Sequence, residues 1–226
     1  MDDTTVVITG GSSGIGAACV RAFASEGATV VACARETDAI ETMAAEFETV
    51  EAVRADVRDE YDVERLMETA ARLGGTIDVV VANAGINHGT PGQMNLAEEP
   101  YSRFDDTLRT NVRGVFTTVK EAVPHLSEGA RLLVPSGSIA REAKPGMGAY
   151  AISKAGAEAL VRGFATDLDQ SVGIVDPGLV ATEVTGGQGR EAEDVAPMFL
   201  WAATDCPAED LDGQVVDLRA WKKATR

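Results

Sequence analysis

Tyr150 and Lys154 are the residues of this sequence whose types and spacing point most directly to chemistry. They lie four positions apart in GAYAISKAGAEAL, residues 148–160, an alanine-rich stretch that favours a helix. That spacing places both side chains on one helical face. A tyrosine hydroxyl, with an ordinary pKa of about 10, can exchange a proton with a substrate oxygen, and a nearby ammonium would lower that pKa. The same pair also occurs by chance on solvated helices, so its meaning depends on the rest of the chain.

A second candidate is the glycine-rich segment TGGSSGIG, residues 9–16, which follows an apolar run and precedes a helix-like stretch. Glycine permits close backbone approach, and a helix N-terminus presents free N–H groups to an anion. Its spacing, G-x-x-x-G-x-G, is wider than G-x-G-x-x-G, so the interpretation depends on its place between a strand and a helix. The predicted phosphate cradle consists of Gly10, Ser12, Ser13, Gly14, Ile15 and Gly16.

Other catalytic and metal-binding patterns are missing from the sequence. There is no G-x-x-x-x-G-K-[ST] motif, and GSSG lacks the G-x-S-x-G spacing of a serine hydrolase. The histidines, His88 and His125, have no supporting motif, and the three cysteines are scattered without a CxxC pair. We therefore expect no metal site and no disulfide framework, and the cysteines indicate reduced thiols in the cytoplasm.

The elements that would position these residues alternate along the chain. Strands that are apolar throughout are predicted at 4–10, 28–35, 50–57, 77–85, 130–138, 172–178 and 213–218. Helical stretches separate them, including one long stretch over 100–127 and another over 148–168. Such strands indicate a parallel sheet covered on both faces. The predicted fold is a doubly wound, Rossmann-type α/β domain of about seven strands that spans residues 1–226 as a single domain.

The charge of the chain restricts its partners. A formal net charge of −16 argues against binding to nucleic acid or to an anionic membrane surface. No apolar run reaches the roughly 18 residues of a membrane helix, and the acidic N-terminus shows no signal-peptide pattern. We therefore predict a cytoplasmic protein. Five lysines accompany 15 arginines and 36 acidic residues, which is compatible with plain solubility or with adaptation to salt.

Five motifs then occur in a fixed order: TGGSSGIG (9–16), NAG (83–85), TNVRGVF (110–116), YAISK (150–154) and DPGLVATE (176–183). In this order they resemble the short-chain dehydrogenases/reductases, from about Thr5 to Leu218. Each motif alone is weak evidence for the family, but five motifs in the same order are specific to it. The resemblance implies the single-domain branch of that family, an NAD(P)-binding sheet, and hydride transfer between nicotinamide and a carbonyl or secondary alcohol.

The resemblance also implies four catalytic residues. Tyr150 would be the acid/base, and Lys154 would tune it and hold the nicotinamide ribose. Ser138 would orient the substrate oxygen, and Asn111 would hold a water that links the lysine to solvent. Ser138 lies twelve residues before Tyr150, slightly closer than the family pattern, so Ser136 is an alternative. Pro135 should mark the carboxyl end of its strand, because proline lacks a ladder donor.

The end of the second predicted strand discriminates between cofactors. An acidic residue there would bind the ribose 2′-OH of NAD, whereas this sequence has Ala34 followed by Arg35. A small residue and a cation favour the 2′-phosphate of NADP(H) over NAD(H), although Glu36 weakens the case and Arg35 could simply be solvated. Further cofactor contacts implied by the resemblance are Asp56, Val57, Asn83, Ala84, Gly85, Pro177, Gly178, Val180 and Thr182, with Tyr150 and Lys154.

The substrate is not readable from the sequence. The segment after DPGLVAT is short and glycine-rich, which predicts an open site for varied small carbonyls or alcohols. An alternative is a 3-oxoacyl-thioester reductase, for which REAK (141–144) offers basic residues that could meet an acyl-carrier or CoA partner. A non-catalytic nucleotide-sensing protein on the same fold is a third reading, which the retained Tyr150 and Lys154 disfavour. By analogy with the family, we expect a homo-oligomer, either a tetramer or a dimer.

Overall fold

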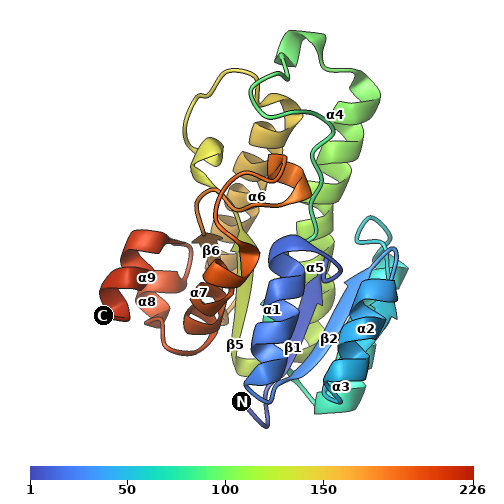
Figure 1. Ribbon diagram of the computed structural model, residues 1–226. Coiled ribbons are helices and arrows are strands. Elements are labelled where there is room, and N and C mark those ends of the chain that lie inside the picture. The colour runs from blue at the N-terminus through green and yellow to red at the C-terminus, as the bar shows by residue number, and fades with distance from the viewer.

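Seven strands form one parallel sheet. The computed structural model describes all 226 residues, and its strand order is β3-β2-β1-β4-β5-β6-β7 (Figure 1). Every pair of neighbouring strands is parallel. The strands are β1 Thr5–Thr9, β2 Thr29–Ala34, β3 Val50–Arg54, β4 Ile77–Val81, β5 Leu126–Pro135, β6 Ser171–Asp176 and β7 Val215–Asp217. The predicted seven-stranded doubly wound fold is therefore confirmed.

Helices cover both faces of this sheet (Figure 1). They are α1 Gly14–Ser25, α2 Asp38–Glu46, α3 Glu60–Gly74, α4 Tyr101–Leu108, α5 Gly114–Ala122, α6 Gly148–Asp167, α7 Ala192–Thr204, α8 Ala208–Leu211 and α9 Leu218–Ala224. Single turns of 3₁₀-helix are η1 Leu96–Glu98, η3 Val123–His125, η4 Ser138–Ala140 and η5 Glu183–Thr185. No helix is both long and apolar enough to cross a bilayer.

Two apolar cores follow from the alternation of strand side chains. Val6 and Ile8 belong to the core that includes side chains of α1, α2 and α7, whereas Val7 belongs to the one that includes side chains of α3, α5 and α6. All three are fully buried. Full burial of such a side chain contributes roughly 1.5–3 kcal/mol. This two-sided burial explains why the strands read as continuous apolar runs rather than as alternating ones.

The topology places a crevice between the ends of β1 and β4. From β1 the chain adds β2 and β3 on one side of the sheet and then returns to add β4 to β7 on the other. At this reversal the connections that follow β1 and β4 leave in opposite directions, which opens a crevice at the carboxyl edge. The glycine-rich segment follows β1, so the fold places it at this edge.

The stretch over 100–127 differs from the single helix that the sequence predicts. Between α4 and α5 the chain forms a π-helical turn, η2 Arg109–Arg113, in which the Gly114 N–H donates to the Arg109 carbonyl. Such single-turn interruptions often lie at functional sites, and this one contains Asn111. The fifth strand also starts earlier than predicted, at Leu126, and it ends at Pro135 as expected.

Candidate active site

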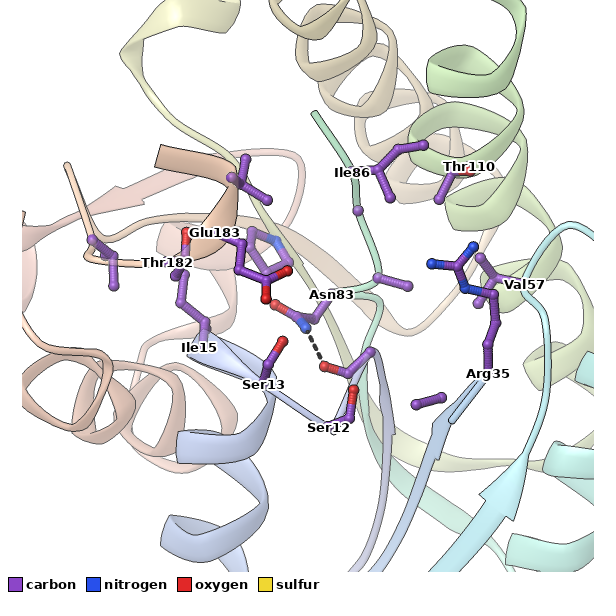
Figure 2. Close-up of a pocket in the computed structure, with 18 of the residues that line it drawn as sticks. Ser12, Ser13, Ile15, Arg35, Val57, Asn83, Ile86, Thr110, Thr182 and Glu183 are labelled. Carbon is purple, nitrogen blue, oxygen red and sulfur yellow. Dashed lines mark hydrogen bonds between the residues drawn. The ribbon is translucent and has the colours of Figure 1, made fainter. Parts of the chain in front are cut away.

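A cleft of about 350 Å³ lies at the carboxyl edge of the sheet. It is lined by 29 residues, and Figure 2 shows part of this lining. The lining combines the turn after β1, the ends of β2 and β3, the segment after β4, one face of α6 and the turn after β6. The cleft therefore joins residues from Gly10 to Thr185, which are 175 positions apart in the sequence.

The turn after β1 forms a backbone cradle at one wall of the cleft. Gly10 adopts φ +67°, and a Cβ on Gly16 would lie 2.1 Å from the Gly10 carbonyl oxygen, so only glycine fits there. The Asn83 amide donates to the carbonyls of Thr9 (3.0 Å) and Gly10 (3.1 Å), and the second contact is visible in Figure 2. This bond fixes the segment after β4 against the turn.

The start of α1 offers unused hydrogen-bond donors. Ser13 is the N-cap of α1, but its side chain makes no capping bond. The backbone N–H groups of Gly14, Ile15 and Gly16 have no acceptor in the protein. The uncapped donors and the helix dipole together favour an anion at this position.

Two arginines lie at the opposite end of the cleft, and their surroundings differ. Arg58 donates to both carboxylate oxygens of Asp56 and also to Asp106, so its charge is balanced. These hydrogen bonds hold the pKa of Asp56 below its usual range. Arg35 forms no salt bridge, although its charge also helps to lower the pKa of Asp56, and its guanidinium lies beside Val57 (Figure 2). The guanidinium without a direct ion pair at this end is therefore that of Arg35.

Tyr150 and Lys154 lie together in the cleft wall, on α6. The Lys154 Nζ is 5.8 Å from the centre of the Tyr150 ring and donates to the Pro135 carbonyl at 2.9 Å. Burial raises the pKa of Tyr150 to about 12. It also lowers the pKa of Lys154 to about 8, against the opposing effect of the Glu158 carboxylate.

The lowered tyrosine pKa expected from the sequence is therefore wrong for the protein without a cofactor. Proximity to Lys154 was expected to favour the phenolate, but removal of the phenol from water outweighs it. The ammonium is also held by the Pro135 carbonyl rather than by the phenol oxygen. At neutral pH Tyr150 is a neutral phenol, which can give a proton.

The two candidate serines have different surroundings. Ser136 lines the cleft, but it is buried and its hydroxyl donates to Glu158 at 2.8 Å. Ser138 does not line the cleft; its hydroxyl donates to Glu142 at 3.3 Å and accepts from Lys144 at 3.0 Å. Both hydroxyls thus already form hydrogen bonds. The partners of Ser138 are more exposed than Glu158, the partner of Ser136, so the hydroxyl of Ser138 can more easily exchange them for a substrate.

Asn111 is buried behind the cleft rather than in its wall. Its Oδ1 accepts from the Ile86 N–H at 2.8 Å, and its Nδ2 donates to the Ile86 carbonyl (2.9 Å) and to the Ser153 hydroxyl (2.9 Å). These bonds tie the segment after β4 to α6. Both donors of the side-chain amide are used in this way, and its oxygen accepts one bond; the role in holding water stays a prediction.

Most of the predicted cofactor residues do line one cleft. They are Gly10, Ser12, Ser13, Gly14, Ile15, Arg35, Asp56, Val57, Asn83, Ala84, Gly85, Tyr150, Lys154, Pro177, Gly178, Val180 and Thr182. Gly16 supports the turn from behind. Lining residues outside the predicted cofactor set include Ile86, Thr110, Arg58 and Glu183. Three of these lie in or beside motifs, because Ile86 follows NAG, Thr110 begins TNVRGVF and Glu183 ends DPGLVATE, whereas Arg58 lies in none of these motifs.

The short segment after the β6 turn is well anchored. The Thr185 hydroxyl donates to the Val180 carbonyl at 2.6 Å, and Asn87 donates to the Val184 carbonyl at 3.2 Å. Glu183 begins this segment, and its carboxylate projects into the cleft on the side of Ser13 (Figure 2). An acidic group, the last residue of the DPGLVATE motif, therefore lies near the anion cradle.

The segment REAK, residues 141–144, does not form the basic pocket mouth that the sequence suggested. Arg141 contacts the buried carboxylates of Glu158 and Asp176 instead of projecting to a partner. Lys144 is exposed and pairs with Glu142 at 3.1 Å. The basic residues of REAK therefore present little net positive charge at the surface.

Comparison with known proteins agrees with this architecture. Residues 4–193 match the family described as short chain dehydrogenase. The chain is 35% identical over 189 residues to 2-(R)-hydroxypropyl-CoM dehydrogenase of Xanthobacter autotrophicus, covering 79% of this chain and 75% of that protein.

Two solved structures are also similar. A short chain dehydrogenase from Burkholderia cenocepacia in complex with NADP has a TM-score of 0.84 and 28% identity, with 97% of each chain covered. The 3-ketoacyl-(acyl-carrier-protein) reductase from Brucella melitensis, complexed with NADH, has a TM-score of 0.85 and 26% identity, covering 95% of this chain and 96% of that one. With the match over residues 4–193, these similarities show that the chain belongs to the short-chain dehydrogenase/reductase family of oxidoreductases.

Proposed function

We propose that this protein transfers a hydride between NADP(H) and a small carbonyl or secondary alcohol, with Tyr150 as the proton donor and acceptor. One observation carries the proposal: a single cleft contains both the uncapped glycine turn and the Tyr150–Lys154 pair. An anion cradle alone would suit many nucleotides. A buried phenol and ammonium at the other side of the same cleft add a proton-transfer site.

The residues of the cleft fit a nicotinamide dinucleotide. The free N–H groups at the start of α1 would hold the pyrophosphate, and a Cβ at Gly14 would lie 2.9 Å from the Thr182 side chain, so glycine keeps the passage open. Asp56 and Val57 would border the adenine, and Lys154 would hold the nicotinamide ribose. When bound, the cofactor supplies the carbon that gives or accepts the hydride.

Arg35 supports the choice of NADP(H). Its guanidinium is in no salt bridge, whereas that of Arg58 is in two, and the residue before it, Ala34, places no negative charge beside a 2′-phosphate. Arg58 cannot take this role without giving up Asp56 and Asp106. Two of the similar structures hold NADP and NADH respectively, so the fold itself accepts both.

Tyr150 and Lys154 would act on the substrate oxygen in sequence. In reduction, the neutral phenol donates its proton to the carbonyl oxygen as negative charge develops there. The Lys154 ammonium then stabilises the phenolate that remains, and a relay beginning at Lys154 returns a proton from solvent. We place the substrate oxygen near Ser138, whose exposed partners Glu142 and Lys144 can yield to it, and keep Ser136 as the alternative.

A 3-oxoacyl-thioester reductase is the second candidate. The similarity to the Brucella melitensis reductase favours it. The engagement of Arg141 with buried carboxylates weakens it, because fewer basic groups remain to meet an acidic carrier or CoA. Thioester substrates should therefore be included in any panel, both as free CoA esters and as carrier conjugates.

We also propose a homo-oligomer, a tetramer or dimer, in the cytoplasm. Phe116 on α5 and Ile152 on α6 are exposed apolar side chains, with 42% and 38% of their surface accessible, and a subunit contact would cover them. Light scattering of the purified protein would give the assembly directly.

The decisive test measures hydride transfer and cofactor binding separately. The protein is assayed against a panel of carbonyls, alcohols and thioesters with NADPH and with NADH, at low and high salt. Wild type should turn over at least one class with NADPH preferred. Tyr150→Phe should lose turnover by roughly 10²–10⁴-fold while NADPH still binds. Normal turnover in Tyr150→Phe would refute the proton-transfer role, and NADPH binding without any turnover would favour the sensor alternative.

A further inference from the structure

Three charged side chains lie behind the cleft and have no part in the function proposed so far. Arg141 follows η4, Glu158 lies on α6 and Asp176 ends β6. The Arg141 Nη1 donates to Glu158 Oε1, and its Nη2 donates to Asp176 Oδ2. The Glu158 side chain is 2% exposed and that of Asp176 is 10% exposed, while Arg141 is 35% exposed. Arg141 therefore bridges two buried carboxylates.

Each carboxylate is attached to a part of the cleft wall. Glu158 also accepts from the Ser136 hydroxyl at 2.8 Å, at the carboxyl end of β5. Asp176 also accepts from the Gly178 N–H at 3.1 Å, in the turn after β6. Arg141 thus links the end of β5, the helix α6 and the turn after β6, which are three of the segments that line the cleft.

Lys154 lies one helical turn before Glu158 on α6, so the two side chains share a helix face. Its ammonium donates to the carbonyl of Pro135, the residue next to Ser136. Burial alone would drive the proton off Lys154, and the Glu158 carboxylate opposes that loss. A buried carboxylate needs cations to compensate its charge; Arg141 is the cation in direct contact, and it shares this role with Lys154.

We propose, building on the function proposed above, that Glu158 and Arg141 are positioning residues: the Glu158 carboxylate keeps the proton on Lys154, and Arg141 compensates that carboxylate and ties it to the turn after β6. Both act on the substrate only through Lys154 and the turn. A purely structural ion pair would hold the segments together without changing the proton affinity of Lys154.

The surroundings of Lys154 make Glu158 the group to test. β5 presents the neutral carbonyl of Pro135, and η2 presents the neutral Asn111 near Ser153. Arg162 also approaches Glu158, at 3.8 Å, but it is 55% exposed and screened by solvent. The titratable groups that act on Lys154 directly are Tyr150 and Glu158. Arg141 and Arg162 contact Glu158, and Asp176 contacts Arg141.

The experiment follows the proton on Lys154 by NMR, using protein labelled with ¹³C at the lysine Cε, without cofactor or substrate. The chain has only five lysines, and Lys154→Arg assigns the Lys154 signal by its disappearance. The other four are exposed and serve as internal references. The wild-type signal should titrate near pH 8.

Glu158→Gln should move the Lys154 midpoint down by about one pH unit, because the nearest anion is removed while the amide can still accept from Ser136. Arg141→Gln should move it up, because the positive charge that competes with Lys154 for the Glu158 carboxylate is then removed. Arg141→Lys, which retains the charge, should restore most of the wild-type value. Arg162→Gln is the matched control and should leave the midpoint within about 0.2 units.

An unmoved Lys154 midpoint in Glu158→Gln would overturn the proposal, as would an unmoved or lowered midpoint in Arg141→Gln. Circular dichroism checks that each variant is folded. If Glu158→Gln does not fold, the proposal is tested by the rise of the Lys154 midpoint in Arg141→Gln and its return toward the wild-type value in Arg141→Lys. The titration measures no turnover. Failure to transfer hydride would therefore refute the proposed function without affecting how the titration is interpreted. Conversely, a failed titration would leave hydride transfer intact.

Discussion

The two halves of the cleft are built by different means. At the turn after β1, the groups that face the cleft are mainly backbone: the free N–H groups at the start of α1 and the turn at Gly10, held by Asn83. On the β5–β6 side, they are side chains whose charges depend on one another, namely Tyr150 and Lys154. A backbone cradle works at any pH and depends on local conformation, whereas a proton-transfer site depends on burial and on neighbouring charges.

The largest effect should come from the reaction side. Lys154→Met should reduce turnover by roughly 10²–10⁴-fold, because no cation then stabilises the Tyr150 phenolate. Because burial lowers the pKa of Lys154 to about 8, its charge is present below that pH and is lost as pH rises through it. Carbonyl reduction by wild type, followed as NADPH oxidation, should decline over that range. The Lys154→Arg variant stays charged and should lack this decline. If its reduction rate still declines with rising pH, the decline is due to the titration of another group.

The next effect tests the backbone cradle. Gly16→Ala places a Cβ 2.1 Å from the Gly10 carbonyl oxygen, so the turn must shift. Cofactor affinity, measured by calorimetric titration with NADPH, should fall roughly 100-fold, and overpacking should cost about 1–3 kcal/mol of stability.

Gly163→Ala is the matched control for that substitution. Gly163 lies on α6 with no neighbour within 4 Å of an added Cβ, so alanine should stabilise the helix by about 0.5–1 kcal/mol and leave NADPH binding unchanged. Equal effects of the two substitutions would contradict a cradle that requires glycine at position 16.

A smaller effect should separate the cofactors. Arg35→Gln should weaken NADPH binding about 10–100-fold, because a charge-assisted bond to a 2′-phosphate contributes roughly 1.5–3 kcal/mol. NADH binding should change little, and so should turnover at saturating cofactor. Titration of both cofactors into the variant and wild type measures this. A parallel loss of NADH affinity would show that Arg35 supports the site in general and does not read the phosphate.

The smallest effect concerns acid stability at the adenosine end. Hydrogen bonds from Arg58 depress the pKa of Asp56, so this carboxylate stabilises the fold above its unfolded value of about 3.9 and ceases to do so as pH falls through its folded value. The Asp56 side chain is 28% exposed, which limits the contribution to about 1 kcal/mol. Asp56→Asn should therefore lower stability to urea at pH 7 and reduce the loss of stability in acid. A fall of the same size at every pH would contradict this origin.

Much of the fold was predictable from local patterns. Apolar runs separated by helices indicated seven parallel strands, and the structure contains them. The π-helical turn at Arg109–Arg113 was not predicted; within it, Asn111 bonds to Ile86 and Ser153, which are distant in the chain. A helical pattern in the sequence shows neither these tertiary contacts nor the local change in helix type.

The sequence by itself determined the cradle and the spacing of the tyrosine and lysine, because glycine conformation and helix periodicity are local properties. The charge state of that pair was decided by the tertiary structure. Burial raises the pKa of Tyr150 and lowers that of Lys154, and burial depends on strands and helices brought together from across the chain. The same holds for Arg141, which looked like a surface cation in REAK but reaches Glu158 and Asp176 once β6 lies beside β5. Desolvation and long-range ion pairs are set by the fold, and sequence spacing carries no record of them.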